Sequence, residues 1–182
     1  MLLAAALISG CASTPKVFSQ QDPTADFAAF RTYGFYDNPS TNDASYESLM
    51  TSFLKVSVAQ QMDIRGLTYD PDNPDIMVNF FLNTQEKVRS RQVPSMGGYY
   101  GYRDPFYDGW GGYAYETRID QYTEGTLNID VADVSKQKLI WEGAVVGRIT
   151  DEVIRNLERE IDLAVVEIFK QFPIESLYKV QD

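Results

Sequence analysis

The spacing of hydrophobic positions changes several times along the first half of the chain, and each spacing predicts a different element. Aromatic and β-branched residues over 32–36 predict a short strand. Over 45–65 apolar side chains recur every three to four positions, which predicts an amphipathic helix with Ser45 as its N-cap and Gly66 just past its end. Over 76–91 apolar residues recur at every second position, which predicts a strand.

The second half of the chain shows the same two spacings. Apolar and polar residues alternate over 117–132, which predicts a strand with one buried face and one wet face. Polar residues over 133–138 predict a hairpin turn, and a further strand follows over 139–145. Thr150 is a good helix cap, and the apolar stripe behind it predicts a helix over 150–172.

These elements predict an α+β domain with the order β-α-β-β-β-α. Each helix has one apolar face, and three of the strands follow one another as antiparallel neighbours. We therefore expect a two-layer sandwich, in which both helices lie on one face of a four-stranded, mainly antiparallel sheet. This single domain would occupy residues 25–174 and be followed by a C-terminal tail over 175–182.

A glycine- and tyrosine-rich segment at 94–116 separates two of the strands and matches neither spacing. Glycine at this density costs too much backbone entropy for a helix or strand, so a long loop is predicted. Its aromatic rings would suit stacking on sugars or burial in a protein interface. Alternatively, the loop is disordered or only covers Met77 and Phe81, which lie on the second apolar side of the preceding strand. The candidate contact residues are Tyr99, Tyr100, Tyr102, Phe106, Tyr107, Trp110 and Tyr113.

The only cysteine of the chain lies directly after an apolar run over 2–8 and two small residues. This pattern resembles a bacterial lipobox, which implies a signal peptide at 1–10, lipid attachment at Cys11 and a lipidated tether over 11–24. No Lys or Arg precedes the cysteine, so the signal peptide is expected to be incomplete at its N-terminus. The residue directly after the cysteine is Ala12. By resemblance to enterobacterial lipoproteins, in which Asp at this position retains the protein at the inner membrane, Ala12 favours a location at the periplasmic face of the outer membrane. The alternative is an ordinary thiol in a disordered N-terminus.

Composition narrows the classes of function. The formal net charge is −10 at pH 7, so we expect no nucleic-acid partner, because little would neutralise the phosphates. The chain has 0 histidines and 1 cysteine, which removes the commonest general base and the usual ligands of zinc and haem. We therefore expect a protein that is not an enzyme and that holds neither a metal nor a cofactor.

Several short motifs follow one another in a fixed order. They are Phe-Ala-Ala-Phe-Arg-Thr-Tyr at 27–33, Arg-Gly-Leu at 65–67, Asp-Ile-Met-Val at 75–78, Gly-Thr-Leu-Asn-Ile-Asp at 125–130, Leu-Ile-Trp-Glu-Gly at 139–143 and Phe-Pro at 172–173. Their order and spacing over 22–174 resemble bacterial lipoproteins that carry domain of unknown function 4136. The resemblance implies a lipid-anchored envelope protein and supplies no catalytic residues.

Together these features predict a non-enzymatic binding or scaffolding domain, anchored to the membrane through lipid on Cys11. Its partner would be another envelope protein or a glycan, and the oligomeric state stays open. The alternative is a glycan- or peptidoglycan-binding module that uses the aromatic loop 97–115.

Overall fold

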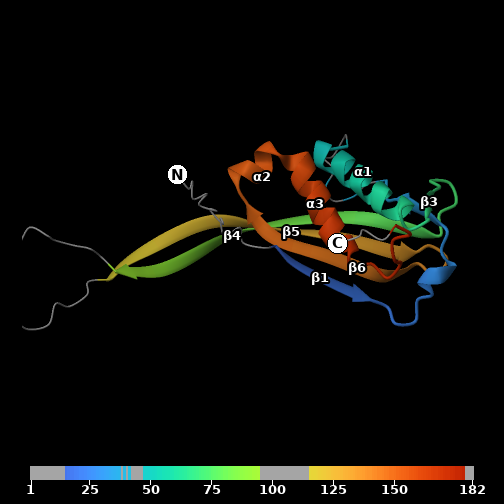
Figure 1. The fold of residues 1–182 in the computed structure, drawn as a ribbon, viewed down its shortest axis with the longest axis horizontal. Helices are drawn as coiled ribbons and strands as arrows, with labels where there is room; N and C mark the ends of the chain where they lie inside the picture. The colour runs from blue at the N-terminus through green and yellow to red at the C-terminus, as the bar shows by residue number, and fades with distance from the viewer. Residues whose placement is uncertain (1–14, 38, 40, 42–46, 95–114, 179–182) are drawn as a thin grey trace, which may run out of the picture.

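The computed structural model of the protein describes residues 15–37, 39, 41, 47–94 and 115–178, and the account below is confined to them. In this part of the chain, a sheet of 6 strands lies beneath a layer of helices (Figure 1). The elements are β1 (Lys16–Gln21), the 3-10 helix η1 (Phe27–Ala29), β2 (Thr32–Phe35), α1 (Leu49–Asp63), β3 (Thr68–Tyr69), β4 (Ile76–Pro94), β5 (Tyr115–Asp133), β6 (Lys138–Ile149), α2 (Asp151–Arg155) and α3 (Leu157–Phe169).

The predicted four-stranded, mainly antiparallel sheet with two helices on one face is wrong. The sheet has 6 strands in the order β1-β6-β5-β4-β2-β3. It is mixed, because β2 runs parallel to both β3 and β4. The carboxylate of Asp75 fixes the start of this parallel pairing, since its Oδ2 accepts the backbone N–H groups of Arg31 and Thr32 at 2.7 and 3.0 Å. These hydrogen bonds hold the pKa of Asp75 below its usual value.

The two additional strands have little hydrophobic pattern. In β1 only Val17 is partly buried against the core, and the other residues are exposed. Antiparallel pairing with β6 holds β1 at the edge of the sheet, with Gln21 opposite Trp141. The sheet therefore begins inside the segment 11–24, which composition assigned to a tether. β3 has only 2 residues, too few to show any period.

The helical layer has three α-helices in the described residues, because the predicted helix over 150–172 is interrupted at Asn156. The backbone of Asn156 leaves the helical region, and its Nδ2 donates to the carbonyl of Glu152 at 3.1 Å. The first helix starts at Leu49, later than predicted, and Ser48 accepts its capping hydrogen bond from the backbone N–H of Thr51. The predicted cap, Ser45, lies outside the described residues. None of the helices in the described residues is long and apolar enough to cross a membrane.

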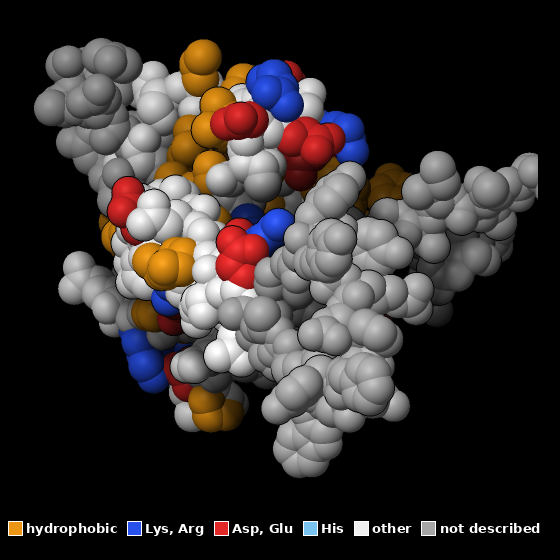
Figure 2. Space-filling model, turned by 90° about the vertical axis from the view of Figure 1, so that its left-hand side faces the viewer, with side chains coloured by type: hydrophobic (Ala, Val, Ile, Leu, Met, Phe, Trp, Pro, Cys, Tyr) orange, Lys and Arg blue, Asp and Glu red, His pale blue; other side chains and the backbone are white. Residues whose placement is uncertain are grey.

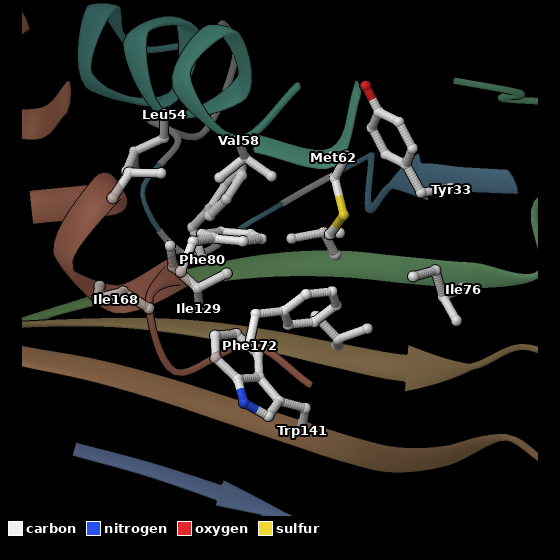
Figure 3. Packing of buried hydrophobic residues seen from close by; sticks show 14 of the residues in the cluster. Tyr33, Leu54, Val58, Met62, Ile76, Phe80, Ile129, Trp141, Ile168 and Phe172 are labelled. Atoms are coloured by element: carbon white, nitrogen blue, oxygen red, sulfur yellow. The ribbon is translucent and has the colours of Figure 1, made fainter. Parts of the chain in front are cut away.

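The hydrophobic core lies between the helices and the sheet (Figure 3). Trp141 of β6 contacts the rings of Phe169 and Phe172, with centroids 5.7 and 4.9 Å apart. Gly143 lies directly beneath this cluster, so that the backbone of β6 approaches Trp141 and Ile168 closely. The close packing therefore requires a residue without a side chain at position 143.

The half-buried guanidinium of Arg65 joins the ends of α1 and α3. Its Nη2 donates to the carbonyl of Phe169 at 2.7 Å, and its Nε donates to the carbonyl of Ile174 at 2.9 Å. Its Nη1 donates to the carbonyl of Gln61 in α1 at 2.8 Å. The bonds to Gln61 and Phe169 reach carbonyls in the last turns of α1 and α3, where carbonyls lack an intrahelical partner, and the bond to Ile174 ties down the segment after α3. Gly66, which follows, has the predicted left-handed conformation with a φ of +79°.

A two-stranded arm projects from the body of the domain (Figure 1). β4 and β5 pair without interruption until Pro94 lies opposite Tyr115, whereas β6 ends opposite Thr123. We define the arm as residues 87–94 of β4 and 115–122 of β5. Its two strands meet the predicted loop at 94–116.

We predict that Gly143→Ala destabilises the fold, because an added Cβ would lie 2.3 Å from Cη2 of Trp141 and 2.4 Å from Cγ2 of Ile168. Both side chains are fully buried. Relieving the overlap must shift the core, at a cost of about 1 to 3 kcal/mol. Urea unfolding measures the loss, with Gly147→Ala as the control in the same strand, since its added Cβ has Pro15 Cβ nearest at 4.0 Å. Equal stability of the two variants would contradict this packing.

Candidate functional site

The face of the sheet opposite the helices, called the outer face here, is not covered by any described helix (Figure 1). Strand alternation places Phe81 and Asn79 of β4 on this face, because Phe80 and Val78 point into the core. Phe81 is 39% exposed there. Within the described residues, the outer face therefore leaves part of the apolar surface of the sheet exposed.

A hollow of about 390 Å³ lies on the outer face, close to the turn between β5 and β6. Its apolar wall includes Met77 and Leu139, and Leu139 is 47% exposed. Its polar wall includes Asn79 and Asp130. The full lining is Tyr36, Met77, Asn79, Asp130, Ala132, Asp133, Val134, Gln137 and Leu139.

Asp130 is the least satisfied polar group of this hollow. Its Oδ1 is buried and has no hydrogen-bond partner among the described protein atoms. Strand register places Asp130 between Asn79 of β4 and Glu142 of β6 in one row across the sheet. Burial, together with the negative charge of Glu142, raises the pKa of Asp130 from 3.8 to about 6.

The charged groups around Asp130 do not neutralise the negative charge of its carboxylate. Glu142 accepts a hydrogen bond from Nδ2 of Asn128 at 2.9 Å, and no ion pair within the described ranges includes Asp130 or Glu142. Asp133 differs, because Ser135 and Lys136 donate to it at 2.7 and 3.0 Å and hold its pKa below the usual value. The hollow thus combines an apolar wall with the uncompensated carboxylate of Asp130, and Glu142 lies opposite Asp130 on β6, outside the residues that line the hollow. This combination suits a Lys or Arg side chain, which has an apolar stem and a cationic head.

A second depression of about 600 Å³ lies between α1 and α3. Its rim includes Leu49 and Val56, which are 73% and 57% exposed. Hydrophobic side chains gather over the helical layer at the top of Figure 2. Its lining includes two acids, Glu158 and Asp162, and Asp162 already accepts a hydrogen bond from Ser57 at 3.0 Å. The depression therefore offers apolar contact without an unsatisfied polar group.

The sequence-predicted site residues are not brought together by the described structure. Cys11 lies outside the described residues, and so do the seven aromatic residues of the predicted loop, which are Tyr99, Tyr100, Tyr102, Phe106, Tyr107, Trp110 and Tyr113. Asp130 and Glu142 were missed, because alternation alone marks them as ordinary solvent-facing residues. No signal in the sequence could have found the pair, because Asp130 faces Glu142 only through a shift in the register of β5 with β6.

Comparison with known proteins gives a family and a fold. Residues 17–174 match the family described as Domain of unknown function (DUF4136). No curated protein matches the chain.

The comparison with solved structures includes the following two. A PDZ domain protein from Parabacteroides distasonis is similar with a TM-score of 0.55 and 13% identity over 89% of this chain, which spans 37% of that protein. At this identity the likeness shows the fold alone. A PelC dodecamer from Paraburkholderia phytofirmans has a TM-score of 0.49 and 8% identity, over 91% of this chain and 100% of that chain.

We predict that Asp130→Asn stabilises the protein at pH 7.5 by about 1 to 2 kcal/mol and has little effect at pH 4. The pKa of Asp130 in the folded protein, about 6, exceeds the ordinary value of 3.8, so folding favours the protonated carboxyl. The stability that the fold gains from the protonated carboxyl of Asp130 is complete below about pH 4 and is lost as the pH rises through about 6. Urea unfolding at both pH values measures the difference, with Asp72→Asn in an exposed turn as the charge-matched control. An equal gain at both pH values would contradict the raised pKa.

Proposed function

The chain belongs to the DUF4136 family, a domain of unknown function, and we propose that it is a non-enzymatic binding or scaffolding domain whose outer face receives a protein partner. The observation that carries this proposal is the buried, unpartnered Oδ1 of Asp130 in the hollow. A buried polar atom without a partner costs about 1 to 3 kcal/mol, and a cationic group from a partner would recover it. The exposed apolar side chains Phe81 and Leu139 on the same face would add buried area.

The composition of the hollow favours binding over catalysis. A raised pKa beside a second carboxyl also occurs in general acids. Among the lining residues that the structure describes, however, none is a Ser, Thr or Cys that could act as nucleophile, and none is a Lys or Arg that could stabilise a developing anion. Hydrolysis of envelope material by the wild type, abolished in Asp130→Asn, would overturn the non-enzymatic assignment.

Lipid attachment at Cys11, on the periplasmic face of a bacterial outer membrane, is the second part of the proposal. β1 begins at Lys16, so only a few residues separate the cysteine from the sheet edge. Fully extended, this link spans about 17 Å, at roughly 3.3 to 3.6 Å per residue. An anchor at Cys11 would therefore hold the domain close to the bilayer surface.

We predict that a clickable palmitate analogue labels the wild-type protein in cells of its bacterial host and that Cys11→Ala abolishes the label. Thr14→Ala, which leaves the cysteine in place, should keep the label. Gel fluorescence after membrane fractionation gives the readout, with the wild type expected in the outer-membrane fraction. Label that persists in Cys11→Ala, or an unlabelled wild type, would disprove lipid attachment at this residue.

We predict that a photo-crosslinking amino acid at Leu139 captures a protein partner in living cells and that one at Ile154 does not. Leu139 lines the hollow, whereas Ile154 is 63% exposed on α2, away from the outer face. Asp130→Arg should remove the crosslink at Leu139, because it places a cation where a cation is bound. Equal yields at both positions, or no dependence on Asp130, would contradict docking at the hollow.

A further inference from the structure

Two pairs of like charges lie directly opposite each other on neighbouring strands. In the arm, Arg91 of β4 faces Arg118 of β5, and in the body Asp130 of β5 faces Glu142 of β6. Like charges in directly opposite positions destabilise a sheet. Both pairs therefore carry an electrostatic cost within a single copy of the protein.

Neither pair is neutralised within the described residues. Nearby charges do find partners, since Lys87 lies 3.6 Å from Glu124 and the guanidinium of Arg148 lies 3.9 Å from the ring centroid of Tyr122. In contrast, no ion pair or cation–π contact in the described part of the chain involves either member of the arginine pair. The arm thus presents an unpaired cationic end, and the body presents an acidic pair without an ion-pair partner, of which Asp130 lines the hollow.

One copy cannot bring its own two pairs together. Arg118 and Asp130 belong to the same continuous strand, at positions of the same parity, so their side chains leave the same side of β5. Twelve residues separate them, which corresponds to about 40 Å of extended chain at roughly 3.3 Å per residue. The rigid strand keeps this separation, so the two pairs can meet only between molecules.

We propose that the hollow receives the arm of a second copy of this chain, with Arg91 and Arg118 of one copy placed against Asp130 and Glu142 of the other. Arginine forms bidentate, charge-assisted hydrogen bonds with carboxylates, and its apolar stem matches the wall at Met77 and Leu139. This inference rests on the proposed function, because it names the partner of the same docking face.

The isolated arm also lacks structural support. Beyond Thr123 the described strands β4 and β5 pair only with each other, and a two-stranded ribbon is marginally stable in water. Val88 and Ile119 in the arm are 66% and 65% exposed. Contact with the body of a second copy would stabilise the two-stranded arm and shield its edges from pairing with other strands.

A charge-swap experiment tests this contact in the purified full chain with Cys11→Ala. At 50 mM salt, we expect sedimentation velocity to show an assembly of two or more copies. Arg118→Glu and Asp130→Arg should each weaken self-association at least about tenfold, because each places like charges in contact. An equimolar mixture of the two variants should regain the assembly, since each variant supplies the charge that the other needs. High salt should weaken all these contacts.

Arg155→Glu on α2 makes the same charge change away from both pairs and should leave the assembly unchanged. Asp130→Asn keeps the size of the side chain and should weaken association without unfolding the protein, which circular dichroism would verify. A monomeric wild type at 50 mM salt, or folded variants whose mixture stays monomeric, would overturn the inference. If the crosslinking probe at Leu139 still captured a different protein, the proposed function would stand and only the self-association would be rejected. If the probe captured no protein at all, the proposed function and the self-association would both be rejected.

Discussion

The guanidinium of Arg65 is the interaction on which the arrangement of the helices depends. It joins the ends of α1 and α3 through the carbonyls of Gln61 and Phe169, and it also binds the segment that follows through Ile174. Removing it would take a hydrogen-bond donor from the carbonyls of Gln61 and Ile174, whereas the carbonyl of Phe169 would still accept from the backbone N–H of Phe172. An unsatisfied carbonyl costs about 1 to 3 kcal/mol when it is buried. Because the two helices are joined, they cover the inner face of the sheet as one unit. The outer face is left without a helix over it in the described residues.

Hydrophobic spacing predicted the elements that bury side chains and missed those held by main-chain pairing. The helix α1 and the hairpin of β5 and β6 follow from their patterns, and Thr150 caps a helix as its sequence position indicates. β1 has almost no apolar face, so no periodicity could reveal it. The break at Asn156 depends on one side chain bonding to the carbonyl of Glu152, which competes with the helix only in that local geometry.

The candidate site could not be derived from the sequence, because a bulge decides which side chains share a face. The pairing of β5 with β6 shifts between Val131 and Ala132, and Ile140 is the additional residue. Without this shift Trp141 would lie opposite Asp130. With it, Trp141 enters the core and Glu142 reaches the outer face beside Asp130. A one-residue change of register thus creates the acidic pair, and alternation alone contains no sign of it.

The position of β1 also determines how the domain would respond to mechanical load. Lys16 pairs with Val146 at the end of β6 from which the arm projects, so the chain enters the sheet beside the root of the arm. Consider a pull at Lys16 that is directed along β1. The hydrogen bonds from Lys16 to Gln21 would then be loaded together in shear rather than opened one after another. An edge strand in this orientation would transmit tension to the sheet as a whole, and the domain could remain folded while held under force.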